Sequence, residues 1–145
     1  MKQITYFIVL IAALSLFGKT ANAQCLDFAK TRGFAALDTA AYVPEGRLNA
    51  IPLSEGDNLD VYKSFFRGRT YKVVVIGEDN MPTLEFKVSN FQRETLYDSK
   101  TEGSTSWVFT SETNQNLIIS VEVPKAGSGA SPKTGCIAVI VGFEE

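Results

Sequence analysis

Carboxylates and basic side chains are the charged groups on which any chemistry of this chain must rest. The 145 residues include 16 acids and 14 Lys or Arg, but no histidine. The absence of histidine excludes Ser-His-Asp and Cys-His nucleophilic sites, histidine acid–base catalysis and every histidine-containing metal site. Two cysteines are also too few for an all-cysteine zinc or iron–sulfur site, which requires four thiolates.

Three acids, Glu55, Asp57 and Asp60, gather around one turn signal. Oxygen-rich turns can hold Ca²⁺, which takes about six to eight oxygen ligands. Solvated turn acids are the alternative interpretation, because the EF-hand spacing of acids is absent. A glycosidase would need two carboxylates at a fixed separation, and nothing in the sequence selects two of the acids. Calcium is therefore the one cofactor under consideration, and the chain otherwise predicts none.

Basic and aromatic residues alternate in the segment that follows. Lys63, Arg67 and Arg69 surround Phe66. If Phe66 is exposed, the four residues form a ligand patch suited to a sugar, a peptide or an acidic partner. The alternative is that Phe66 covers a sheet edge and the cations only solubilise the chain. Trp107 presents a similar choice between a sugar-stacking platform and core packing, which its alternation with Phe109 favours.

The N-terminus has the pattern of a secretory signal peptide. Lys2 is followed by an apolar run over 6–17 and by Ala21-Asn22-Ala23, which predicts cleavage after Ala23. The run is shorter than the roughly 20 residues of a membrane-spanning helix. Loss of residues 1–23 leaves 12 basic and 16 acidic side chains, a net charge of −4. The sequence thus predicts an exported protein, periplasmic or secreted, and argues against a general nucleic-acid binder.

The two cysteines, Cys25 and Cys136, predict one disulfide. Export delivers the chain to an oxidising compartment where disulfides persist. A bridge that closes so long a loop stabilises by about 4–5 kcal/mol in the chain-entropy model. Two buried free thiols are the alternative.

Residues 24–47 form an N-terminal arm whose conformation, short helix or extended, the pattern leaves open. From position 48 to 145, short apolar or alternating runs recur at intervals of about ten residues between turn signals. The eight expected strands are 48–53, 59–65, 69–76, 83–88, 94–98, 106–110, 115–123 and 136–143. This spacing predicts an all-β antiparallel sandwich of the jelly-roll kind, with a long Gly- and Ser-rich loop over 125–133.

The order of several short motifs resembles the bacterial pre-peptidase C-terminal domain. The motifs are L-S-E-G-D at 53–57, F-x-G-x-x-Y at 66–71, L-E-F-K-V at 84–88, L-Y-D-S at 96–99 and W-x-F at 107–109. The resemblance implies a small jelly-roll sandwich of secreted proteins, non-catalytic and in some members calcium-binding. The final strand, G-C-I-A-V-I-V-G-F, is instead similar to small exported proteins of Bacteroidetes-type bacteria. Asp38-Thr39-Ala40 resembles their O-glycosylation site, with Thr39 as acceptor.

These observations lead to three hypotheses of different classes. The first is a non-catalytic exported sandwich that binds or supports an envelope partner, either a polysaccharide or a protein. The second is an assembly module that oligomerises through an open sheet edge. The third is a hydrolase that works with carboxylates alone.

Overall fold

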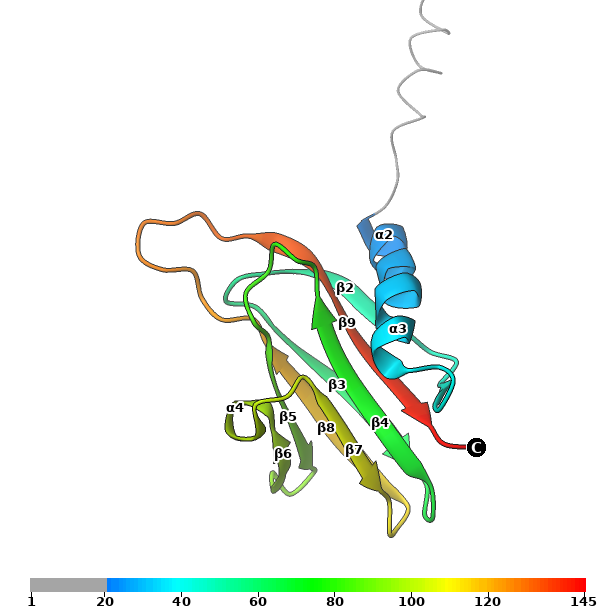
Figure 1. The fold of residues 1–145 in the computed structure, drawn as a ribbon. Helices are drawn as coiled ribbons and strands as arrows, with labels where there is room; N and C mark the ends of the chain where they lie inside the picture. Colours follow the sequence, from blue (N-terminus) through cyan, green and yellow to red (C-terminus); the bar gives the residue numbers. More distant parts are fainter. Residues whose placement is uncertain (1–20) are drawn as a thin grey trace, which may run out of the picture.

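The computed structural model describes residues 21–145 as two antiparallel sheets and a short N-terminal helix (Figure 1). Sheet A contains β1 (Val43–Pro44), β2 (Asn49–Ser54), β4 (Thr70–Gly77), β7 (Ser106–Thr110) and β9 (Thr134–Phe143). Sheet B contains β3 (Asn58–Phe65), β5 (Glu85–Asn90), β6 (Thr95–Asp98) and β8 (Gln115–Glu122). All eight expected strands are present, so the predicted all-β sandwich is confirmed.

The order of the strands is that of a jelly roll. Sheet A runs β2-β9-β4-β7 and sheet B runs β3-β8-β5-β6, so from β2 onward consecutive strands lie in opposite sheets, except for the β5–β6 hairpin within sheet B. Strand β9 is central, because β4 pairs along one of its edges and both β1 and β2 pair along the other. This placement explains why β9 is apolar at nearly every position: both of its faces are covered.

Strand β1 is an addition to the expected set. The sequence predicts a turn at Pro44-Glu45-Gly46, yet Val43 pairs with Phe143 and Pro44 with Gly142. A two-residue edge strand tolerates Pro44, since proline removes a backbone donor only where the strand has a neighbour on that side. The turn begins one residue later, where Glu45 N–H donates to Val141 C=O.

Two apolar clusters hold the layers together. The larger fills the space between the sheets and includes Phe65, Tyr71, Phe86 and Ile119, all almost fully buried. The smaller lies between the outer face of sheet A and the N-terminal helix. Trp107 and Phe109 belong to the larger cluster as half-buried members, so Trp107 packs in the interior and is not a surface platform.

The N-terminal arm is helical, which settles the alternative left open by the sequence. Helix α2 (Ala21–Phe28) continues through a π-helical turn, Ala29–Gly33, into α3 (Phe34–Leu37). Gly33 permits close packing here, because a Cβ at this position would lie 2.9 Å from the Ile140 side chain. A second short helix, α4 (Ser99–Glu102), follows β6.

The predicted disulfide is present and joins α2 to the central strand of sheet A. Cys25 and Cys136 are bonded, and 111 positions of sequence separate them. Both residues are buried in the smaller cluster. Most of the predicted signal peptide, residues 1–20, lies outside the described residues. Within residues 21–145, no helix is long and apolar enough to cross a membrane.

Candidate partner-binding surface

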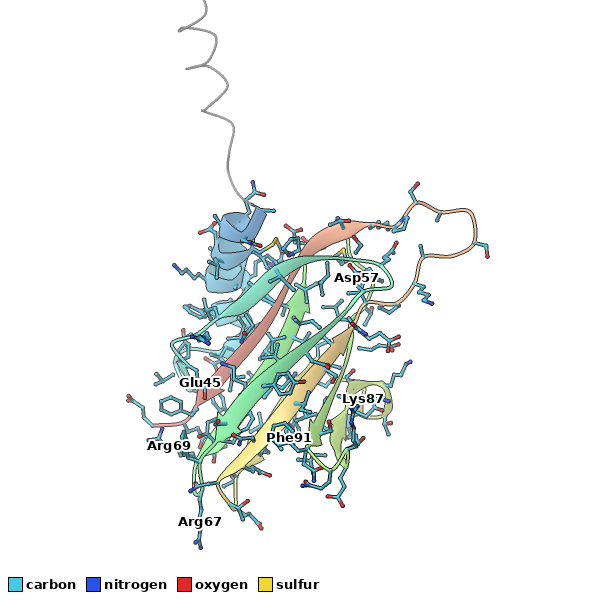
Figure 2. All side chains as sticks on the ribbon, turned by 180° about the vertical axis from the view of Figure 1, so that it is seen from behind. Glu45, Asp57, Arg67, Arg69, Lys87 and Phe91 are labelled. Atoms are coloured by element: carbon cyan, nitrogen blue, oxygen red, sulfur yellow. A yellow bond between two sulfur atoms is a disulfide. The ribbon has the colours of Figure 1, made fainter. Side chains whose placement is uncertain are left out.

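The outer face of sheet B is not covered by the N-terminal helix, which packs on sheet A. Figure 2 shows this face toward the reader, with the N-terminal helix behind sheet A on the far side. Three aromatic side chains are exposed on it or at its end: Tyr62 at 63%, Phe66 at 57% and Phe91 at 54%. Scattered apolar residues are normal on protein surfaces, whereas grouped exposed aromatics mark interaction sites.

Alternation along β3 places Tyr62 on this open face. Val61 and Phe65 point into the core, so Tyr62 and Ser64 point outward. Phe91 belongs to the hairpin turn between β5 and β6, where Asn90 N–H donates to Glu94 C=O. The rings of Tyr62 and Phe91 lie 6.2 Å apart between centroids, at an interplanar angle of 22°. The turn between β5 and β6 therefore places the aromatic ring of Phe91 against sheet B, whereas turns of this kind usually carry polar side chains.

The connection between β3 and β4, which crosses from sheet B to sheet A, presents Phe66 and Arg67 on a fixed backbone. Phe66 N–H donates to Tyr71 Oη at 2.9 Å, and Arg67 N–H donates to Asn114 Oδ1 at 2.9 Å. Gly68, whose φ of 80° suits glycine, donates to Ser111 C=O at 2.7 Å. The backbone is thus anchored while the two preceding side chains are exposed.

We call Tyr62, Phe66, Arg67 and Phe91 the aromatic surface. Tyr62 is at an outward position of β3, Phe66 and Arg67 belong to the connection that follows the strand, and Phe91 stacks on Tyr62. In Figure 2, Arg67 lies at the lower end of this face and Phe91 above it. The arrangement is suited to recognition, since aromatic residues and Arg are enriched in the binding cores of protein interfaces.

The structure does not bring Lys63 and Arg69 into this surface. Lys63 points between the sheets, on the inward positions of β3, with a side chain only 10% exposed. Its Nζ pairs with Glu45 at 3.1 Å and donates to Arg47 C=O at 3.3 Å. Arg69 directly precedes β4 of sheet A, with its guanidinium 4.8 Å from the Phe143 ring centroid. Of the four predicted patch residues, Phe66 and Arg67 share one surface.

The three acids considered as calcium ligands make different contacts. Glu55 Oε2 accepts from Lys133 N–H at 2.9 Å and Asp57 Oδ2 accepts from Ser54 N–H at 2.8 Å, so both brace the base of the 124–133 loop and its neighbouring turn. Asp60 stands apart on the outer face of sheet B. Within residues 21–145, no three acidic or cysteine side chains are arranged to hold a metal ion.

Charged residues of both signs line the other half of the open face. A shallow depression of about 290 Å³ is lined by Asp60, Glu85, Glu122, Lys87, Arg93 and Lys100. Lys100 pairs with Glu85 at 2.7 Å, and this hydrogen bond, followed by the charge of Glu85, raises the pKa of Lys100. Lys87 pairs with Asp98 at 3.2 Å. Because much of this charge is internally paired, the aromatic surface is the more distinctive half.

The two remaining sequence candidates are accessible. Thr39 is exposed directly after α3, where Asp38 takes a left-handed conformation with a φ of 66°. The loop over 124–133 projects from the end of the sandwich opposite to Arg67 (Figure 2). Its residues are mostly exposed, and Glu55 and Gly56 hold its two ends through backbone hydrogen bonds.

Sequence reasoning missed Tyr62 and Phe91. The outward parity of Tyr62 could have been read from β3, where Leu59, Val61 and Phe65 mark the inward positions. Phe91 stands between Asn90 and Gln92 in a polar turn, and an aromatic residue there is itself a signal of a surface role. Their stacking joins residues far apart in the chain, so it required the strand order.

Comparisons with known proteins bear on the fold. No family model matches the chain, and no curated protein matches it. The resemblance to the pre-peptidase C-terminal domain is thus supported only as far as a β-sandwich. Among solved structures, the chain is similar to the crystal structure of Aeromonas hydrophila PliG, described as a periplasmic lysozyme inhibitor of g-type lysozyme. The TM-score is 0.50 at 16% identity, covering 68% of this chain and 85% of PliG.

Proposed function

We propose that this chain is an exported, non-catalytic module that binds a protein partner through the aromatic surface. The observation that carries the proposal is the placement of Tyr62, Phe66 and Phe91 on an uncovered sheet, each more than half exposed. Burial of such rings supplies most of the energy of a typical interface core. The signal-peptide pattern supports export, and the predicted cleavage after Ala23 leaves the helix from Gln24 onward and the disulfide with the sandwich.

The similarity in fold to PliG supports a protein partner over a purely structural role. PliG is described as an inhibitor of g-type lysozyme, so a jelly roll of this size can serve as a protein-binding scaffold. A g-type lysozyme is therefore the first partner to test. A shared fold does not identify the binding partner. The experiment must therefore also be able to detect binding of a protein other than a lysozyme.

The experiment compares the mature protein with two variants. The double variant Tyr62→Ala/Phe91→Ala removes the stacked pair, and Val108→Ala removes an exposed apolar side chain from sheet A as a matched control. Each is assayed for inhibition of g-type lysozyme and for retention of envelope proteins on a column. We expect a specific partner to bind at least about tenfold more weakly to the double variant and unchanged to the control.

Two outcomes contradict this proposal. If the wild type retains no protein that the double variant fails to retain, the aromatic surface is not a protein-binding site. If the wild type is slowed by a neutral polysaccharide in affinity electrophoresis, and the double variant is not, the surface binds sugar. The near-parallel rings of Tyr62 and Phe91 are the specific reason to include that second assay.

A further inference from the structure

One half of strand β4 has no neighbour on the β7 side. Strand β4 pairs with β9 along 71–77, but with β7 only along 70–74. Val75 is nevertheless only 1% exposed, so the open sheet edge is confined to Ile76 and Gly77, at the end of β4 that is remote from Arg67. This place lies on the other sheet from the aromatic surface.

Backbone groups of Val75 and Gly77 point to the side of β4 that faces away from β9. Residues of an antiparallel strand alternate in the side to which their N–H and C=O point. Glu78 N–H donates to Cys136 C=O, on the β9 side, so both polar groups of Gly77 face the opposite side. Val75 N–H donates to Thr105 C=O at 3.0 Å, without a return bond. Among residues 21–145, the N–H and C=O of Gly77 have no hydrogen-bond partner.

A pocket of about 320 Å³ adjoins these free groups. Val75, Ile76 and Gly77 line it together with Met81, Leu84 and Ala36, the last from helix α3. The Arg32 side chain also lines it and is held by two hydrogen bonds to Asp79, at 2.8 and 3.0 Å. The pocket is thus bounded by the backbone at the end of β4, by the apolar side chains of Met81 and Leu84, and by the helical segment that carries Arg32 and Ala36.

The free groups of Gly77 define what can fill the pocket. A free donor and a free acceptor on one residue are the pair that a facing residue of an antiparallel strand satisfies. An added peptide strand gains main-chain hydrogen bonds from such an edge and specificity from pockets that take its side chains. We infer that the edge at Gly77 is a strand-addition site, which binds an extended peptide segment of another protein with an apolar side chain against Met81 and Leu84.

The test uses the mature protein and pools of random hexapeptides with blocked termini. In the free protein, hydrogen exchange of the Gly77 amide should be faster than that of Val75, whose N–H is already bonded. A binding pool should shift the NMR signal of Gly77 and slow its exchange. Val75 and Thr105 should shift with it, and Tyr62 and Phe91 should not.

Two variants on one helical turn supply the control. Ala36→Trp fills the pocket from an exposed position, and Ala35→Trp adds the same ring at an exposed position that does not line the pocket. We expect Ala36→Trp to weaken peptide binding by at least tenfold and Ala35→Trp to leave it unchanged. Equal binding by the two variants, or no pool that protects Gly77, overturns the inference. Protection of Gly77 that grows with protein concentration alone assigns the edge to a second copy and also overturns it.

Discussion

The outer faces of the two sheets differ in what covers them. On sheet A, the helical segment buries Val74, Ala138 and Ile140, and the Cys25–Cys136 disulfide fixes it in place. On sheet B, the corresponding face carries Tyr62, Phe91 and paired charges in contact with solvent. Both sheets contribute side chains to the interior, so the interior does not explain the difference. The covered face contributes to stability, and the bare face is free for a partner.

The largest effect on the free energy of unfolding should come from removal of the disulfide that holds the N-terminal helix against sheet A. The double variant Cys25→Ser/Cys136→Ser releases the constraint on the unfolded chain, which is worth about 4–5 kcal/mol for so long a loop. Urea unfolding of the oxidised protein and of the variant measures the difference. A loss well below about 2 kcal/mol would mean that the helix is held by its apolar contacts alone.

Two leucines on opposite faces allow a size-matched comparison. Leu37 is 0% exposed under the helix, whereas Leu96 is 44% exposed on sheet B. We expect Leu37→Ala to cost about 2–5 kcal/mol, because it opens a cavity. Leu96→Ala should stay within about 0.5 kcal/mol. Equal losses of unfolding free energy in the two variants, measured by thermal or urea unfolding, would contradict the view that the N-terminal helix stabilises sheet A by covering it.

A substitution at Gly142 tests how closely the N-terminal helix packs against sheet A. A Cβ at this position would lie 2.8 Å from Leu37 Cδ2 and 3.0 Å from the Val43 carbonyl oxygen. Since the backbone oxygen cannot move as a flexible side chain does, Gly142→Ala should destabilise by about 1–3 kcal/mol. Gly127→Ala is the control, because nothing lies within 4 Å of a Cβ there. Similar melting temperatures for both variants would show that the helix shifts without cost.

Substitutions on the exposed outer face of sheet B should reduce partner binding but hardly change stability. Tyr62→Ala removes a ring that is 63% exposed, so the free energy of unfolding should change by about 0.5 kcal/mol or less. Partner binding should nevertheless fall, as proposed above. A large loss of stability in urea would instead mean that the Tyr62–Phe91 stack supports the fold.

The smallest effect is expected at the exposed pair between Arg32 and Asp79. Hydrogen bonds from Arg32, followed by its positive charge, hold the pKa of Asp79 below its ordinary value. The stabilisation from such a carboxylate is present above its unfolded pKa and is lost as the pH falls through its folded pKa. The small difference in melting temperature between the wild type and Asp79→Asn should therefore vanish at strongly acidic pH. A difference that grows on acidification would contradict this.

Local pattern was enough to predict the strands and the disulfide, but not the surfaces. Alternation such as that of Leu84, Phe86 and Val88 reports a half-buried strand directly, and two cysteines allow one pairing. The helical arm was left open because Gly33 interrupts its pattern, and packing against β9 decides its conformation. Lys63 was grouped with Phe66 by proximity in the chain, whereas Lys63 occupies an inward position of β3 and Phe66 is exposed just after the strand ends.

The position of β9 also has a consequence for when the protein can fold. This strand comes after all of its neighbours in the chain, yet β1, β2, β4 and the helix all pack or pair against it. Sheet A therefore cannot close until β9 has been synthesised, and closure joins segments that are distant in sequence. Such high contact order slows folding. For a chain predicted to cross a membrane, the delay favours a form that is still unfolded when translocation begins.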